Sequence, residues 1–294
     1  MNQPLVSVIL ATYRREEPLK RALESLKNQT YGNYEVIVVD DNDDFGWNEI
    51  VCRATEEAGF PVRLIVNHPN LGSAKARNAG IEAARGMYTT FLDDDDLYLP
   101  EKISKQAAAM MESNADYCIT DLELFSEHEK LVECRVRDYI RSTEPEQLLK
   151  YHLMYHMTGT DTLMFRTDYL RAIGGFPPID VGDEFYLMAQ AITSGGRFCY
   201  LPGCEVKAYV HSGENGGLSS GESKIRGENG LHEYKKQFFS DLDAKSRRYI
   251  KMRHHAVLAF AYLRKKSYGK FVMHAASGFF AAPVACVRLL VRGR

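Results

Sequence analysis

The 294-residue sequence lacks several patterns that identify common classes of protein. None of its six cysteines forms a Cys-x-x-Cys pair, so reduced, buried thiols are a better interpretation than a zinc site or a disulfide framework. No run of about 20 uninterrupted apolar residues is present, which argues against a membrane-spanning helix. The opening residues, Met1-Asn-Gln-Pro4, lack the basic and apolar regions of a signal peptide, so we expect a cytoplasmic protein.

Two glycine-rich phosphate-binding motifs are also missing. No Gly-x-Gly-x-x-Gly follows the first apolar run, residues 6–12, and the chain has no Gly-Lys-Ser/Thr loop. The usual dinucleotide-binding and NTPase interpretations therefore lose their main support. A nucleotide bound without such a loop needs its diphosphate neutralised by other means, most simply by a metal ion.

Acidic residues are absent from the last part of the chain. Residues 244–294 contain 12 Lys and Arg but no Asp or Glu, so the net charge of −2 divides into +12 for this segment and −14 for the remainder. This segment reads as helical. A basic helical segment with apolar stretches predicts contact with an anionic membrane surface, the inner face of the plasma membrane. The alternative is a helical hairpin that packs on the rest of the protein and exposes a basic face. A nucleic-acid partner is not expected, because no suitable fold or aromatic-basic platform is present.

Four apolar, β-prone runs alternate with helical patterns in the first hundred residues, at 6–12, 34–40, 62–66 and 87–92. This order predicts an α/β protein with a doubly wound, mostly parallel sheet flanked by helices. In such sheets ligands bind beyond the carboxyl ends of the strands. Polar clusters follow three of the four runs, and these clusters are Thr12-Tyr13-Arg14, Asp40-Asp41-Asn42 and Asp93–Asp96. We therefore expect a binding site along that edge.

The four consecutive carboxylates at Asp93–Asp96 are the most unusual feature of the sequence. Like charges crowded at a strand end repel one another unless a cation lies among them, and oxygen ligands suit Mg²⁺ or Mn²⁺. The alternative is a cap for a following helix that starts near Pro100, where acids are favoured by the helix dipole. One capping Asp would satisfy that need, so we interpret the group as a metal and phosphate site and Asp96 alone as the cap.

At this point the sequence resembles the family 2 glycosyltransferases with the GT-A fold. The resemblance covers about residues 5–211 and rests on several motifs in the family's order. They are Val6-Ser-Val-Ile-Leu-Ala-Thr-Tyr-Arg, Leu26-Lys-Asn-Gln-Thr-Tyr, Val38-Val-Asp-Asp-Asn, Asn70-Leu-Gly-Ser-Ala-Lys-Ala-Arg-Asn-Ala-Gly, Phe91-Leu-Asp-Asp-Asp-Asp-Leu-Tyr-Leu-Pro, Gly174-Gly-Phe and Gly182-Asp-Glu-Phe-Tyr-Leu. It implies metal-dependent, inverting transfer of a sugar from a nucleotide-sugar to a saccharide or lipid-linked acceptor, as in the synthesis of bacterial surface polysaccharides.

The resemblance also implies roles for individual residues near the first strands. The expected donor-binding residues are Thr12, Tyr13, Arg15, Asp40, Asp41, Arg77, Asn78, Asp93 and Asp94. A carboxylate that accepts the imide N–H of uracil is sound chemistry, which favours a UDP donor. The family's Asp-x-Asp falls on Asp93-Asp94-Asp95, so Asp95 and then Asp93 are the expected ligands of Mn²⁺ or Mg²⁺. His211 lies where related enzymes supply a third ligand. For Tyr13 and Arg77 the alternatives are ordinary packing and a solvated helix face, and a structural role remains open for His211.

The acceptor side is expected to supply the general base. An inverting transfer needs a carboxylate that takes the proton of the acceptor hydroxyl. The family has Glu-Asp, whose second acid is usually the base, whereas this sequence has the reverse order at Asp183-Glu184. Glu184 is therefore the first candidate and Asp183 the second. The alternative for both is a pair of acids at a helix N-terminus.

The expected organisation is a catalytic domain at residues 1–221, with a nucleotide-binding half at 1–100 and an acceptor half at 101–221, followed by a basic helical region at 222–294. Two other functions stay open on the sequence alone. A nucleotidyltransferase that makes nucleotide-sugars would share the sheet and carboxylates, but its glycine-rich loop is missing after residue 12. The reversed Asp183-Glu184 motivates the other alternative, a non-catalytic nucleotide-sugar-binding or scaffold protein.

Overall fold

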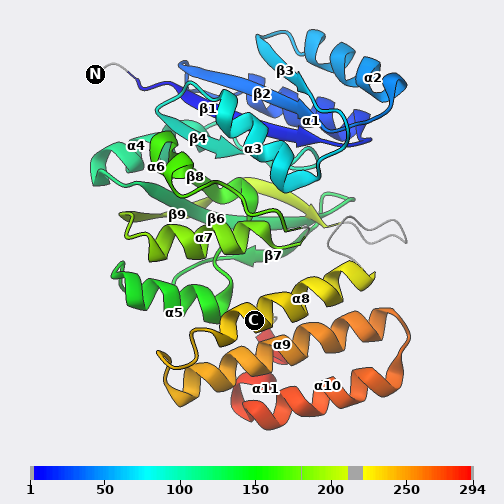
Figure 1. Cartoon of the computed structure of the whole chain (residues 1–294), viewed down its shortest axis with the longest axis vertical. Coiled ribbons are helices and arrows are strands. Elements are labelled where there is room, and N and C mark those ends of the chain that lie inside the picture. The colour runs from blue at the N-terminus through cyan, green and yellow to red at the C-terminus, as the bar shows by residue number, and fades with distance from the viewer. Residues whose placement is uncertain (1–2, 180, 211–220, 293–294) are drawn as a thin grey trace. The chain divides into compact units, whose positions relative to one another are not determined.

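The computed structural model describes residues 3–179, 181–210 and 221–292, and the chain divides into two compact units (Figure 1). The sheet unit comprises Met1–Pro145, Met157–Ile179 and Asp183–Ser212. The helical unit comprises Glu146–His156, Asp180–Gly182 and Gly213–Arg294. The helical unit thus takes in a short internal segment as well as the C-terminal residues.

The sheet unit is built on one mixed sheet. In spatial order it reads β3-β2-β1-β4-β8-β6-β9-β5, with β7 paired to β6. The strands are β1 Val6–Thr12, β2 Tyr34–Asp40, β3 Val62–Val66, β4 Tyr88–Phe91, β5 Leu97–Tyr98, β6 Tyr117–Ser126, β7 Leu131–Arg135, β8 Leu163–Arg166 and β9 Phe198–Val210.

The first four strands pair as the sequence predicts. β1 lies between β2 and β4 and runs parallel to both, and β3 extends the parallel group beyond β2. The prediction of an α/β fold is confirmed. The sheet is more mixed than expected, because β5, β7 and β8 pair antiparallel to their neighbours. These strands come after the alternating β-α pattern has ended. The sequence pattern therefore does not predict whether they run parallel or antiparallel to their neighbours.

Helices cover the two faces of this sheet. Side chains from α1 Glu16–Lys27, α2 Phe45–Glu56 and α4 Lys102–Ser113 share one apolar core with β1 and β2. Helix α3 Ser73–Ala83 lies against β1 and β2, and α6 Thr167–Ala172 against β8. A Cβ on Gly80 would come within 2.5 Å of a methyl carbon of Ile9, so only glycine allows α3 to approach β1 this closely. The short turn η1 Thr160–Thr162 leads into β8, and α7 Asp183–Thr193 follows a loop.

The helical unit contains α5 Pro145–Tyr155 without its first residue, together with α8 Gly221–Lys236, α9 Ala244–Arg264, α10 Tyr268–Ala281 and α11 Pro283–Arg292. The basic segment is helical as expected, and its last part is divided into two helices, because Pro283 cannot continue α10 and starts α11 instead. Asp243 caps α9 by accepting a hydrogen bond from the Ser246 N–H at 2.8 Å. Within the described ranges, every helix is too short or too polar to cross a lipid bilayer.

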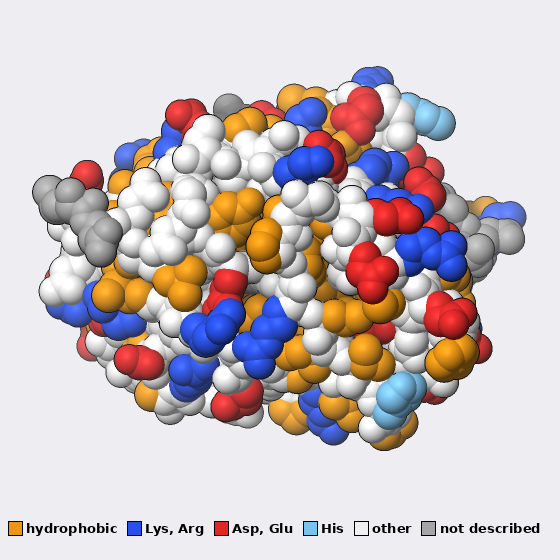
Figure 2. All heavy atoms as spheres, turned by 90° about the horizontal axis from the view of Figure 1, so that it is seen from above, with side chains coloured by type: hydrophobic (Ala, Val, Ile, Leu, Met, Phe, Trp, Pro, Cys, Tyr) orange, Lys and Arg blue, Asp and Glu red, His pale blue; other side chains and the backbone are white. Residues whose placement is uncertain are grey.

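Charged side chains of both signs lie interspersed on the face drawn in Figure 2, with hydrophobic side chains between them. Nucleic-acid-binding surfaces are usually strongly positive. The part of this face that the structure describes shows no patch of that kind.

Candidate functional site

The carboxyl ends of β1, β2 and β4 meet at one edge of the sheet. The register pairs Thr12 with Asp40, the last residues of β1 and β2, and Ile9 with Phe91, the last residue of β4. Because Asp93–Asp96 begin two residues after the end of β4, all three predicted polar clusters come together here. The site described below is built at this edge and lies wholly within the sheet unit.

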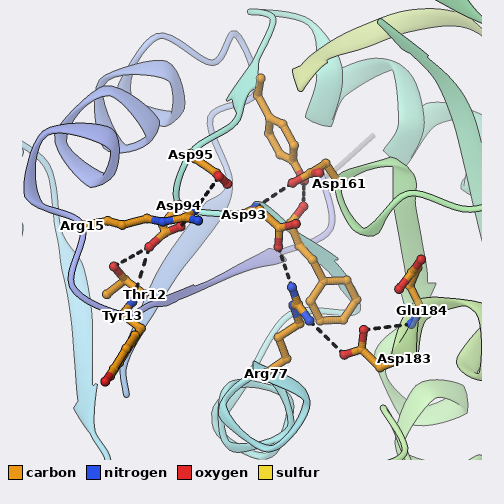
Figure 3. A network of polar contacts seen from close by, with 12 residues as sticks. Thr12, Tyr13, Arg15, Arg77, Asp93, Asp94, Asp95, Asp161, Asp183 and Glu184 are labelled. Atoms are coloured by element: carbon orange, nitrogen blue, oxygen red, sulfur yellow. Dashed lines mark hydrogen bonds and ion pairs between the residues drawn. The ribbon is translucent and has the colours of Figure 1, made fainter. Parts of the chain in front are cut away.

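Asp94 links the ends of β1 and β4 (Figure 3). Its Oδ2 accepts a hydrogen bond from the Thr12 hydroxyl at 2.7 Å and from the Tyr13 N–H at 3.4 Å. The Arg15 guanidinium lies 2.9 Å from Asp94 Oδ1 and also pairs with Asp95. Burial raises the pKa of Asp94 to about 6 although Arg15 opposes this shift. Asp94 therefore serves to hold the Thr12–Arg15 segment in place.

Arg77 of α3 joins two carboxylates that are far apart in the sequence. Its Nη2 lies 2.6 Å from Asp93 Oδ1 and its Nη1 lies 2.9 Å from Asp183 Oδ2 (Figure 3). Its guanidinium also lies over the ring of Phe176, 5.3 Å from the ring centroid. Burial alone would lower the pKa of Arg77, but the charges of Asp93 and Asp183 raise it above its usual value. Arg77 is therefore always cationic. Arg77 thereby ties the end of β4 to the start of α7.

Asp161 is a site residue that the sequence analysis missed. It comes from η1, and its Oδ1 accepts a hydrogen bond from the Asp93 N–H at 2.6 Å. Carboxylate oxygens of Asp93, Asp96 and Asp161 lie within 4.8 Å of one another. Burial and the neighbouring Asp93 charge raise the pKa of Asp161 to about 7, and the pKa of Asp96 is also raised well above its usual range. An isolated acid among the threonines of residues 158–162 was its only signal in the sequence.

The prediction that Asp96 caps the next helix is wrong. Helix α4 begins six residues later at Lys102, after the short strand β5, and Glu101 occupies the N-cap position. Asp96 instead turns inward, where its Oδ1 accepts a hydrogen bond from the Tyr209 N–H of β9 at 2.8 Å. It is 6% exposed.

Asp183 and Glu184 form the first turn of α7, and their carboxyl groups point in different directions (Figure 3). Asp183 faces Arg77, and its Oδ1 accepts a hydrogen bond from the Glu184 N–H at 3.1 Å. The Glu184 carboxyl points away from Arg77. Burial raises the pKa of Asp183 to about 6 and also raises that of Glu184. Both are therefore better bases than ordinary carboxylates.

The two predicted carboxylates at the end of β2 are engaged within the protein. Asp40 accepts hydrogen bonds from the Asn42 N–H at 2.9 Å and from the Asn48 amide at 2.8 Å. Asp41 accepts them from the backbone N–H groups of Leu71 and Gly72 at 3.0 and 2.8 Å, and also from a side-chain amide. Both carboxylates order the loops around the edge, and Asp41 in particular fixes the turn that leads into α3.

The remaining predicted donor-binding residues differ in their surroundings. Tyr13 is 44% exposed, so its ring is accessible to a ligand. Asn78 uses both ends of its side-chain amide on the backbone of Phe176, at 2.7 and 2.8 Å, so a donor contact would have to break those bonds. His211 lies outside the described residues.

Known proteins share this architecture. The structure of TarS from S. aureus in complex with UDP-GlcNAc superposes with a TM-score of 0.64 over 96% of this chain and 82% of that chain, at 20% sequence identity. At this level of identity the likeness establishes the fold alone, which is the GT-A fold expected from the sequence.

Relatives are also found by sequence. An uncharacterized glycosyltransferase of Haemophilus influenzae is 40% identical over 196 residues, which are 66% of this chain and 58% of that protein. The Escherichia coli UDP-Glc:alpha-D-GlcNAc-diphosphoundecaprenol beta-1,3-glucosyltransferase WfgD is 29% identical over 126 residues, which are 43% of this chain and 49% of that enzyme. The chain thus spans about half the length of the curated relatives it matches.

Residues 7–172, more than half of the chain, match the family description "Glycosyl transferase family 2". This segment contains the carboxyl edge of β1, β2 and β4, with Arg77, Asp93–Asp96 and Asp161. The chain belongs to glycosyl transferase family 2.

Proposed function

We propose that the protein transfers a sugar from a nucleotide-sugar, a UDP-sugar, to a saccharide or lipid-linked acceptor in the synthesis of a surface polysaccharide, with inversion at the anomeric carbon. The observation that carries this proposal is the Asp93–Arg77–Asp183 chain at the carboxyl edge of the sheet. It brings the carboxylates of the donor side next to a pair of acids on the acceptor side. Support also comes from family membership and from the donor and lipid-linked acceptor in the name of WfgD.

The donor would lie along the ends of β1, β2 and β4. Tyr13 offers an exposed ring on which a base can stack, and Arg15 is a cation beside the carboxylates, suited to the diphosphate. The backbone around Asp41 is fixed by its own hydrogen bonds, so this side of the edge is ordered before a ligand arrives. This order favours tight positioning of the nucleotide.

The carboxylates at the end of β4 fit a divalent cation, Mn²⁺ or Mg²⁺, because several acidic oxygens converge there. Asp96 and Asp161 are 6% and 4% exposed, and each accepts a hydrogen bond from a backbone N–H. The side chain of Asp93 is 33% exposed, and Asp95 lies beside it with its side chain 14% exposed. We infer that Asp93 and Asp95 would hold the cation, together with His211, and that Asp96 and Asp161 support them. Such a cation, when bound, neutralises the donor diphosphate.

Glu184 is the better placed of the two candidate bases. The Asp183 carboxylate is held by Arg77 and by the Glu184 N–H, so its oxygens are already committed. Glu184 points away from this ion pair (Figure 3). In the proposed reaction the acceptor oxygen attacks the anomeric carbon, the bond from that carbon to the phosphate oxygen breaks, and Glu184 takes the hydroxyl proton. Arg77 keeps Asp183 ionised and holds the start of α7 in place.

The helical unit would contact a membrane. One side of α10 exposes Val272, Met273, Phe279 and Phe280, which are 62%, 55%, 44% and 80% exposed. Positions i, i+1, i+7 and i+8 of a helix lie within about a third of its circumference, so these side chains share a face. Lys270 lies in the first turn of this helix, and Lys266 comes two residues before the helix begins. An apolar face beside basic residues suits an anionic lipid surface.

The first prediction concerns the metal ligands. Asp95→Asn should remove Mn²⁺ binding, because it takes the charge from a direct ligand. Asp161→Asn should weaken binding by roughly 10- to 100-fold, as expected for a supporting partner. Isothermal titration of Mn²⁺ in the presence of UDP measures both, with Asp168→Asn on the exposed surface of α6 as the control. If Asp161→Asn lost more Mn²⁺ affinity than Asp95→Asn, the cation would be bound by the buried carboxylates Asp96 and Asp161 and not by Asp95.

The second prediction concerns the base. Glu184→Gln should lower kcat by roughly 10²- to 10⁴-fold while the KM for the donor stays nearly constant, because only proton transfer is lost. Glu112→Gln on the exposed surface of α4 is the matched control.

The pH dependence tests the same assignment. A base works only when ionised, so the wild-type rate should fall as the pH is lowered through the raised pKa of Glu184, and Glu184→Gln should lack this acid limb. Donor binding that persists in wild type without turnover toward any acceptor would favour the non-catalytic alternative. A mutant rate equal to that of wild type would exclude Glu184 as the base.

The third prediction concerns the membrane. Val272→Asp and Phe280→Asp should each weaken binding to phosphatidylglycerol-containing vesicles by roughly tenfold or more, because each removes an apolar side chain from the lipid interface. Phe45→Asp is the matched control, since Phe45 is 76% exposed but lies on α2 of the sheet unit. Vesicle cosedimentation measures the bound fraction. Equal binding of all four proteins would contradict the assignment of this face.

A further inference from the structure

Away from the carboxyl edge of β1, β2 and β4, the neighbouring strands β7, β6 and β9 bring two thiols and a carboxylate together. Cys134 of β7 is directly opposite Glu123 of β6 in the antiparallel pair, so the two side chains share a face. Cys204 of β9 is paired with Asp121, two residues from Glu123, and therefore lies on that face as well. The ligand atoms of Glu123, Cys134 and Cys204 lie within 4.8 Å of one another, and all three residues are half-buried. None of them belongs to the proposed sugar-transfer site.

The local backbone places Cys204 in this group. The pairing of β6 with β9 shifts register around Asp121, and β9 bulges at Pro202 and Gly203 just before Cys204. The Gly203 N–H donates a hydrogen bond to Asp121 Oδ2 at 3.0 Å, which fixes the bulge. Gly203 has a φ of 126°, a conformation that glycine tolerates well.

Asp121 also holds the other side of the group. Its Oδ1 accepts hydrogen bonds from the Arg137 N–H at 2.9 Å and from the Tyr200 hydroxyl at 2.7 Å. It thus connects the chain that leaves β7, three residues after Cys134, to β9. The two thiols are brought together by a buried carboxylate that is itself 3% exposed and fully engaged. An outer partner that positions the first ligands is a regular part of metal sites.

The separation of the two sulfur atoms agrees with shared coordination of a metal. The Cys134 and Cys204 Sγ atoms are 3.6 Å apart. Two thiolates at about 2.3 Å from a tetrahedral Zn²⁺ lie roughly 3.8 Å apart, whereas a disulfide needs about 2.05 Å. Two sulfurs and one carboxylate oxygen form a donor set that suits thiophilic cations and not Mg²⁺ or Ca²⁺.

We propose that Cys134, Cys204 and Glu123 bind a thiophilic divalent cation of the Zn²⁺ type, with water as the fourth ligand. Binding displaces the two thiol protons, forms two metal–sulfur bonds and one metal–oxygen bond, and involves no change of oxidation state. The bound ion connects β7 to β9 across β6. Since β7 pairs only with β6 among the described strands, the metal secures this outlying strand to the sheet.

Cobalt(II) is the probe that tests this site. The full chain is reduced, stripped of metal with a chelator and titrated with Co²⁺, and the near-ultraviolet sulfur-to-cobalt charge-transfer band is recorded. We expect a band that saturates at one Co²⁺ per chain and disappears on addition of Zn²⁺ but not of Mg²⁺. The carboxylate site at Asp93–Asp96 has only oxygen ligands among its described residues and gives no such band, so the result is independent of sugar transfer.

Variants identify the ligands. Cys134→Ser and Cys204→Ser should each abolish the band, and Glu123→Gln should weaken Co²⁺ binding by roughly tenfold or more. Cys52→Ser is the matched control, because Cys52 is also half-buried and lies 3.6 Å from a carboxylate oxygen, that of Glu56. Circular dichroism establishes that each variant is folded.

Three outcomes would overturn the proposal. They are the absence of a charge-transfer band in the reduced wild type, a band that survives loss of both Cys134 and Cys204, and a band lost in Cys52→Ser. A thiol pair that only forms a disulfide gives the first of these outcomes, together with a loss of two mass units after treatment with peroxide.

Discussion

The ion pairs of Arg77 are the interaction on which the candidate site depends. A single guanidinium holds Asp93 at 2.6 Å and Asp183 at 2.9 Å, although these residues belong to opposite halves of the predicted catalytic domain. Both carboxylates are crowded by other acids, and without a fixed cation between them they would repel each other. A lysine could not replace Arg77 here, because it lacks the planar fork that reaches two carboxylates at once.

Cationic side chains near the site are fewer than acidic ones. Arg15 and Arg77 pair with carboxylates of the site. Lys102 is fully buried, with its Nζ 2.7 Å from the Tyr98 hydroxyl. Burial lowers the pKa of Lys102 to about 7 although the Asp161 charge opposes this shift. The acids of the site are Asp93, Asp94, Asp95, Asp96, Asp161, Asp183 and Glu184. Burial is the main cause of the raised carboxyl pKa values, and the neighbouring acids add to it. The excess of negative charge accounts for the fit to a divalent cation.

The sequence predicted the first half of the fold well and the site only in part. Apolar runs mark β1, β2 and β4 because these strands are largely buried, and polar residues at their ends then fall on one edge. The sequence did not predict contacts between residues that are far apart in the chain. Asp161 and Asp93 are 68 residues apart, Arg77 and Asp183 are 106 apart, and no local pattern encodes such pairs.

One error has a local cause, and one group of side chains could not be found from the sequence. Asp96 was taken for a helix cap because Pro100 follows it closely, but the two residues of β5 intervene and turn Asp96 into the interior. The cysteines were judged from spacing along the chain, which finds ligands on one loop or hairpin. Cys134 and Cys204 come from separate strands 70 residues apart, so spacing could not bring them together.

The central claim is that the carboxylate edge binds a nucleoside diphosphate together with a divalent cation. The most direct measurement is the melting temperature of the full chain with UDP, GDP and dTDP, each with and without Mn²⁺. A ligand at 100 times its Kd stabilises a protein by about 2.7 kcal/mol, which corresponds to a shift of roughly 5 °C for a domain of this size. We predict this shift for UDP with Mn²⁺ and a much smaller one for UDP or Mn²⁺ alone. No shift with any nucleotide, with or without the metal, would contradict the account.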